Sequence, residues 1–214
     1  MDILPQLILN SVIAGAIYAL VALGFNLIYS TVKFFDLGYG ALTTVGCYTV
    51  FWLFKTLGLN LYLAVIAGMV VAGLVSFLAD RLVYRQLRAR KASGMVFLVA
   101  ALGIFTLLQA LIAIFFTSQF QTLFPASASS QVYDIGGAVI TQVQLVILVT
   151  GLVLMALLGI LLKKTLFGKA IKAVADDEEV AKIVGINTNT IISAVFFIGG
   201  AIGGLAGILV GFDT

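Results

Sequence analysis

The sequence predicts an all-α fold, a polytopic transmembrane helical bundle, and three observations lead to this class. Of the 214 residues, 62% are hydrophobic and only 10% are charged, a composition too apolar for a soluble globular domain. Apolar stretches long enough to cross the core of a bilayer can be placed about six times along the chain. Basic residues gather in two segments between these stretches, a pattern that orients membrane proteins.

Six apolar segments are expected to form the spans. The second segment is the least regular, because it is short, opens with Gly38 and Gly40 and carries several threonines. A broken or re-entrant helix is therefore an alternative to a plain span at this point. The expected segments are residues 6–30, 37–54, 59–79, 95–116, 143–162 and 191–212.

The basic residues predict the orientation of the bundle. Positively charged loops stay in the cytoplasm, and the two basic segments are separated by two crossings, so one orientation satisfies both. It places the N-terminus outside and makes residues 117–141, which contain no Lys or Arg, an extracytoplasmic loop. The two groups are Arg81, Arg85, Arg88, Arg90 and Lys91, and Lys163, Lys164, Lys169, Lys172 and Lys182.

The segment 163–190 is the largest charged stretch outside the expected spans, and we expect it to form two short helices. Asp176, three residues before Glu179, is expected to begin the second helix, and Gly185 is expected to end it. Two interpretations stay open: a connector that lies on lipid headgroups, or a docking site for another protein, which the small residues favour. The apolar positions are Ala170, Ile171, Ala173 and Val174, then Val180, Ala181, Ile183 and Val184.

Within this segment, the stretch GKAIKAVADDEEVAKIVGIN at residues 168–187 carries a pattern of Gly, Ala, Ala and Gly-Ile. The pattern resembles the permease subunits of bacterial ABC importers for branched-chain amino acids, of the leucine/isoleucine/valine H-subunit type. The resemblance implies that residues 163–190 are a cytoplasmic coupling loop that docks on an ATPase. The family usually has Arg at positions 169 and 172, where this chain has Lys, which lacks the bidentate guanidinium geometry, and Asn at position 177. The coupling residues so implied are Gly168, Lys172, Ala173, Asp177, Ala181, Gly185 and Ile186.

The N-terminal part resembles the same family in SVIAGAIYALVALGFNLIYS at residues 11–30 and in FFDLGYGALTTVGCYTV at residues 34–50. The family typically shows Asn-Phe-Ala-His-Gly at residues 36–40, so Asp36 replaces an Asn and Tyr39 replaces a His. If these positions shape the translocation path, the substrate preference of this chain differs from the family norm. The possible pathway residues are Asp36, Gly40, Thr43 and Thr44.

Two of the acidic residues near the ends of spans also have a plainer interpretation. Asp36 follows Lys33 by three residues at the expected inner end of a span, where a solvated interfacial pair is favoured over a pathway carboxylate. Asp80, directly before Arg81, has the same explanation.

The last expected span carries a ridge of glycines at helical intervals. Such ridges allow close helix packing in lipid, and packing inside one subunit is favoured over a subunit interface. The resemblance covers nearly the whole chain, but family members continue for about two more spans beyond Gly211. It therefore implies that residues 1–214 are a single permease domain truncated at its C-terminus. The packing glycines are Gly199, Gly203, Gly207 and Gly211.

Several chemistries are not expected from this sequence. It contains no His and a single Cys, so we expect no catalytic, cofactor or metal site. No ionisable residue lies near the middle of an expected span, which disfavours coupling to ions. A phosphate-binding loop is absent, so ATP hydrolysis is expected on a partner. The net charge of +3 is too small to indicate nucleic acid as a partner.

The resemblance thus implies the permease subunit of an ATP-driven importer for branched-chain amino acids, in lipid of the bacterial inner membrane. The implied partners are cytoplasmic ABC ATPase subunits, a second permease subunit and an extracytoplasmic substrate-binding protein that meets the outer loops. Alternatives in the same class are permeases for urea, amides or sugars. An alternative from another class is an ion-coupled carrier or a passive channel.

Overall fold

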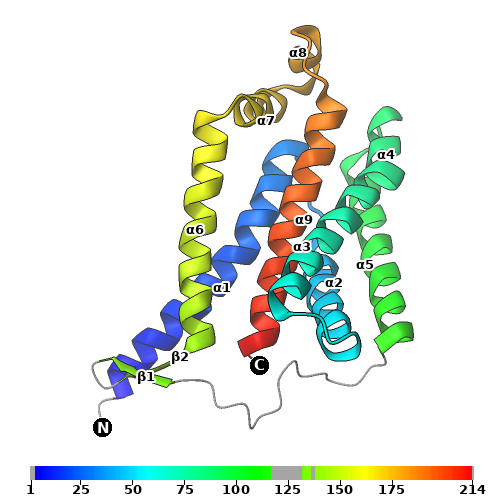
Figure 1. The fold of residues 1–214 in the computed structure, drawn as a ribbon. Helices are drawn as coiled ribbons and strands as arrows, with labels where there is room; N and C mark the ends of the chain where they lie inside the picture. Colours follow the sequence, from blue (N-terminus) through cyan, green and yellow to red (C-terminus); the bar gives the residue numbers. More distant parts are fainter. Residues whose placement is uncertain (1–2, 117–131, 136–137, 214) are drawn as a thin grey trace.

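The computed structural model describes residues 3–116, 132–135 and 138–213, and most of this part is helical. Five of its helical segments are long and apolar enough to cross a membrane (Figure 1). They are α1 (Ile3–Val32), α3 (Leu61–Ala79) with its helical continuation to Ala89, α5 (Gly94–Phe116), α6 (Gln142–Lys164) and α9 (Thr188–Asp213). The predicted all-α helical bundle is therefore confirmed.

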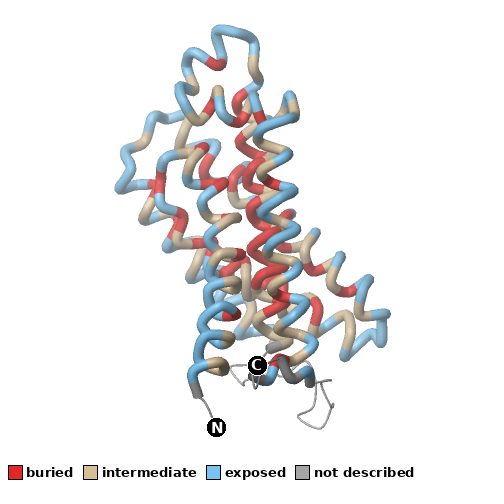
Figure 2. The backbone as a smooth tube through the Cα atoms, turned by 90° about the vertical axis from the view of Figure 1, so that its left-hand side faces the viewer, coloured by how far each residue is buried: buried red, intermediate tan, exposed pale blue. Residues whose placement is uncertain are grey.

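Helix α9 forms the centre of the bundle, with α1, α2 and α3 packed around it and α5 and α6 at the flanks. In the most apolar part of α9, 61% of the residues are buried, against 11–28% in the other four segments. The tube in Figure 2 shows the buried residues concentrated along a central column. The outer helices, in contrast, leave large apolar side chains exposed, as expected for surfaces that meet lipid.

The glycines of α9 explain why this helix can sit at the centre. A Cβ at Gly199 would lie 2.7 Å from the Ile28 side chain of α1, and a Cβ at Gly203 would lie 2.8 Å from the Tyr39 ring. A Cβ at Gly207 would meet the backbone carbonyl of Thr43. The neighbouring residue Gly200 would collide in the same way with Ser76 of α3. Three glycines of the predicted ridge, Gly199, Gly203 and Gly207, thus lie against other parts of this chain, whereas the fourth, Gly211, lines a groove between α1, α2 and α9.

The second predicted span forms a short helical segment. Residues 33–38 are not helical, and helix α2 covers only Tyr39–Phe51 before it continues as the π-helical turn η1 (Trp52–Thr56). This segment is not among the five that are long and apolar enough to cross a membrane. Figure 1 shows α2 in the half of the bundle that lies away from α7 and α8. The backbone is thus helical without interruption from Tyr39 to Thr56, and the sequence alternative of a broken helix is not the one that the structure adopts.

The predicted end of the third span was wrong. Instead of stopping at Ala79, the helix runs on through the π-helical turn η2 (Asp80–Tyr84) into α4 (Arg85–Ala89). No Gly or Pro interrupts this stretch, so nothing in the backbone chemistry ends the helix there. The arginines of the first basic segment therefore stand mostly on a helix and not in a loop.

The two basic segments lie at one end of the bundle, as predicted, and the described part of the loop 117–141 lies at the other. That part is a hairpin of β1 (Val132–Ile135) and β2 (Ala138–Thr141), paired antiparallel with Val132 opposite Thr141. It is fixed to α1, because Val139 N donates to Gln6 Oε1 at 2.7 Å. Residues 117–131 of the predicted loop lie outside the described residues.

The packing against α9 predicts a difference between two glycine substitutions. A Cβ at Gly46 of α2 would lie 2.6 Å from the Cα of Gly204, whereas a Cβ at Gly103 of α5 meets nothing within 4 Å. Gly46→Val should therefore reduce the free energy of unfolding by roughly 1–3 kcal/mol through overpacking. Gly103→Val, the matched control, should change it little. Unfolding midpoints of the two variants in detergent test this, and equal midpoints would contradict the assigned packing.

Candidate functional site

The segment between α6 and α9 forms two short helices, α7 (Leu166–Asp176) and α8 (Glu178–Ile183), as the sequence predicts. They stand at the end of the bundle that carries the basic residues (Figure 1). Helix α7 is amphipathic, with Ile171 and Val174 buried and Lys169 and Lys172 exposed. Because α7 packs against α1, α6 and α9, it is fixed to three of the long helices.

A tight turn joins α6 to α7, and it accounts for one of the predicted coupling residues. The Thr165 hydroxyl donates to the Leu161 carbonyl at 2.6 Å and accepts from Gly168 N at 2.9 Å, so one side chain closes both helix ends. A Cβ at Gly168 would meet the Leu161 carbonyl and would lie 2.6 Å from the Cα of Leu162. Gly168 is therefore required by the turn itself.

The start of α8 differs by one residue from the prediction. Asp177, and not Asp176, caps the helix, because its carboxylate accepts from Glu179 N at 2.8 Å and from Val180 N at 3.0 Å. Asp176 is the last residue of α7 and is exposed. The predicted end of α8 is confirmed, since Gly185 has a φ of +87°, in the left-handed region where glycine is favoured.

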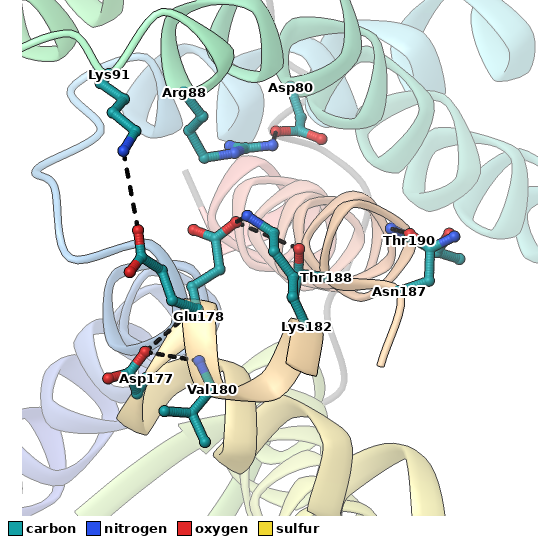
Figure 3. A network of polar contacts seen from close by, with 11 residues as sticks. Asp80, Arg88, Lys91, Asp177, Glu178, Val180, Lys182, Asn187, Thr188 and Thr190 are labelled. Carbon is teal, nitrogen blue, oxygen red and sulfur yellow. Dashed lines mark hydrogen bonds and ion pairs between the residues drawn. The ribbon is translucent and has the colours of Figure 1, made fainter. Parts of the chain in front are cut away.

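Polar contacts hold α8 to its surroundings (Figure 3). Within the helix, Lys182 pairs with Glu178 at 2.7 Å, and the Thr188 hydroxyl at the start of α9 donates to the same carboxylate at 3.3 Å. Lys91 lies 4.0 Å from Glu179, which links α8 to the loop before α5. Both side chains of this last pair are exposed, so the pair adds little stability.

The apolar side chains of α8 do not form the buried face that the spacing predicts. Only Ala181 is buried, while the exposed fractions of Val180, Ile183 and Val184 are 54%, 83% and 68%. These three residues form an exposed apolar surface on α8 and on the residue that follows it. We call this surface the α8 tip. Helical spacing identified the residues, but it could not show that only one of them has a neighbour inside the chain.

The seven predicted coupling residues fall into three groups. Gly168 and Ala181 are buried, and Ala173 and Ile186 are half-buried against the same hydrophobic cluster. The other three, Lys172, Asp177 and Gly185, are exposed. The structure thus brings all seven into one small region at a single end of the bundle. However, the apolar residues of this set, Ala173, Ala181 and Ile186, pack against other residues of this chain.

The plainer interpretation of Asp36 and Asp80 as solvated interfacial residues was wrong. Asp36 is only 4% exposed, and its carboxylate accepts from the Tyr84 hydroxyl at 2.6 Å and from Gly38 N at 2.9 Å. Asp80 is fully buried and binds Arg88 at 2.7 Å and the Ser193 hydroxyl at 2.6 Å. The continued helix turns Asp80 toward Arg88, two turns away, and not toward Arg81.

The predicted pathway residues lie in two places. Thr43 and Thr44 line a groove of about 230 Å³ between α1, α2 and α9, together with Tyr48 and Gly207. Gly40 stands one turn earlier on α2 and is exposed. Asp36 does not line this groove, because it is buried beside Tyr84 in the segment that precedes α2. The groove is mostly apolar, and Thr43, Thr44 and Tyr48 are the lining residues that carry hydroxyl groups.

Comparisons with known proteins place the chain among membrane permeases. The family described as "Branched-chain amino acid transport system / permease component" matches residues 7–214. The chain is 30% identical to the high-affinity branched-chain amino acid transport system permease protein LivH of Escherichia coli, covering 96% of this chain and 70% of that protein. It is 27% identical to BraD of Pseudomonas aeruginosa, a permease protein of the same description, over 97% of this chain and 71% of that protein.

A third relative comes from another organism. The probable branched-chain amino acid transport permease protein LivH of Methanocaldococcus jannaschii is 27% identical, over 99% of this chain and 68% of that protein. No solved structure matches the chain.

The buried ion pair predicts a large effect on stability. Asp80→Asn would leave the mostly buried Arg88 guanidinium without its counter-charge, and this should lower the free energy of unfolding by roughly 3–5 kcal/mol. Adding Arg88→Gln should recover part of the loss. Glu179→Gln, which removes the carboxylate of an exposed pair, is the control and should leave the unfolding midpoint in detergent unchanged. Similar midpoints for Asp80→Asn and Glu179→Gln would contradict the role given to Asp80.

Proposed function

Because the chain belongs to the family of branched-chain amino acid transport permease components, we propose that it forms part of the translocation pathway of an ATP-driven importer for branched-chain amino acids. The chain itself carries out transport and no covalent chemistry. It works in the inner membrane of a bacterium with the α7–α8 end in the cytoplasm, since the positive-inside rule places basic segments there. Its partners are ABC ATPase subunits, a second permease subunit and an extracytoplasmic substrate-binding protein.

The observation that carries this proposal is the exposed α8 tip on a rigidly mounted pair of helices. Val180, Ile183 and Val184 leave a large fraction of their apolar surface in water, and such surfaces mark sites of protein association. The cytoplasmic ATPase is the partner that this end of a permease meets. We therefore assign the coupling contact to the α8 tip, together with the exposed predicted residues Lys172, Asp177 and Gly185.

The mounting of α8 explains how movement of an ATPase reaches the membrane part. Ile171 and Val174 of α7 and Ala181 of α8 belong to one buried cluster with Ile192 and Val195 of α9. Close-packed side chains transmit displacement because they leave no space to absorb it. A push on the α8 tip therefore moves the cytoplasmic end of α9, which contacts α1, α2 and α3 along its length.

The groove of Thr43 and Thr44 is the proposed stretch of the pathway in this chain. It is lined by residues of α1, α2 and α9. A branched-chain amino acid needs an apolar surface for its side chain and hydroxyl or amide groups for its charged ends. The groove offers an apolar surface and the hydroxyl groups of Thr43, Thr44 and Tyr48. The second permease subunit closes the open side. Small shifts of α9 then widen or narrow the groove, which is what alternating access requires.

The coupling contact predicts a loss of ATPase binding on a single exposed substitution. Ile183→Asp places a charge on the α8 tip without touching the buried cluster, so it should weaken binding of the ATPase by at least about tenfold. Leu57→Asp, a control at an exposed leucine in the turn before α3, should leave binding unchanged. Co-purification and affinity measurement with both variants check this, and normal ATPase binding by Ile183→Asp would refute the contact.

ATP dependence separates the proposed importer from a carrier or channel. In proteoliposomes that contain the assembled transporter and its binding protein, leucine uptake should require ATP and should persist when a protonophore removes the proton gradient. Urea and simple sugars should not compete with leucine. Uptake that continues without ATP and stops with the protonophore would overturn the proposed function.

A further inference from the structure

A second cavity, unrelated to the groove of Thr43 and Thr44, lies between the α3–η2–α4 helix and the first turns of α9. Its volume is about 480 Å³. One wall carries Leu74, Phe77, Arg81 and Arg85, and the other runs from Asn187 to Phe197. We call this cavity the α3–α9 groove. Neither the coupling contact nor the proposed pathway makes use of it.

The two walls of the groove change from polar to apolar in the same direction. Along the first wall the residues follow one another at helical intervals of three or four, from Leu74 to Arg85 at the end of the bundle that carries α8. Helix α9 runs the opposite way, so its polar first turn, with Asn189 and Thr190, faces the arginines, and Phe197 faces the apolar part. The groove is therefore polar at the cytoplasmic end and apolar toward the centre of the membrane.

The depth of the arginines matches the headgroup region of a bilayer. Twenty residues separate Leu61, where α3 begins, from Arg81. A helix of that length rises about 30 Å, the thickness of the hydrocarbon core. Arg81 thus stands near the cytoplasmic boundary of the core, and Arg85 lies about one further turn into the headgroup layer.

The positive charge of the groove comes from Arg81 and Arg85. Among the described residues, no carboxylate forms an ion pair with Arg81 or Arg85. Asp80, directly before Arg81, already binds Arg88 and the Ser193 hydroxyl through its two oxygens. Glu178 and Glu179 line a neighbouring pocket with Arg85, but their ion pairs are with Lys182 and Lys91. The Arg81 guanidinium lies 5.9 Å from the centre of the Phe77 ring, a cation–π contact that holds it against the groove wall.

From these observations we propose that the α3–α9 groove binds an anionic phospholipid of the cytoplasmic leaflet. Its phosphate lies between Arg81 and Arg85, close to the Asn189 and Thr190 side chains at the positive end of α9. One acyl chain follows Leu74, Phe77 and Phe197 toward the membrane centre. Basic pockets between helices on the cytoplasmic side are the expected sites for anionic headgroups. The lipid would hold the continued helix of α3 against α9 where the ATPase displaces it.

Lipid binding can be measured on the assembled transporter by native mass spectrometry. Phosphatidylglycerol and phosphatidylcholine with the same acyl chains are added in turn to the wild-type protein and to the variant Arg81→Gln/Arg85→Gln. The wild type should prefer phosphatidylglycerol, and the variant should bind it about tenfold to thirtyfold more weakly. The control Lys163→Gln/Lys164→Gln removes the same charge at exposed positions outside the groove and should retain the preference.

Two further experiments test whether the ligand is a complete phospholipid, with its acyl chains, or a phosphate group alone. Ala194→Phe fills the apolar half of the groove while both arginines stay, and it should also weaken phosphatidylglycerol binding. Glycerol phosphate, which lacks acyl chains, should not displace the lipid at equal concentration. The proposal is overturned if the control loses binding as much as the arginine variant, or if glycerol phosphate competes fully. It is equally overturned if the assembled transporter shows no preference, as expected when another subunit covers the groove.

Discussion

The close approach of α9 to α1, α2 and α3 is the contact on which the rest of the structure depends. Helices in lipid gain no hydrophobic energy from association, so they are held by close packing of small residues. Gly46 and Gly204 bring α2 and α9 together without side chains between them. Because α2 is short and follows a non-helical segment, this contact positions it, and with it the groove of Thr43 and Thr44.

The end of the bundle that carries α7 and α8 depends on the same central helix. Buried polar groups connect three segments there, since Asp80 joins η2 to Ser193 of α9, and Tyr84 joins η2 to Asp36 before α2. Satisfied polar groups in a low-dielectric interior fix one geometry, because any other leaves them unpaired. Helix α8 therefore stands on a region in which polar contacts connect α9, the start of α2 and the helix that continues α3, and through which the proposed contact with an ATPase would act.

Much of this architecture could be predicted from the sequence, but the local chemistry could not. Hydropathy placed the long helices, and the residue patterns identified α7, α8 and the turn at Gly185, because each leaves a local signal. The burial of Asp36 and Asp80 leaves none, since their partners Tyr84, Arg88 and Ser193 come from distant positions or from a helix that was expected to end at Ala79. The exposure of Ile183 was also hidden, because an apolar side chain looks the same in sequence whether its neighbour is in the chain or in a partner.

The central claim is that the α8 tip is the contact through which an ATPase drives this permease. The most direct measurement places a photoreactive amino acid at Ile183 in the complete transporter, in cells that take up leucine. Our account predicts an adduct with the ATPase subunit whose yield changes when ATP is bound. Adducts with lipid alone, in a transporter that still imports leucine with ATP, would contradict it.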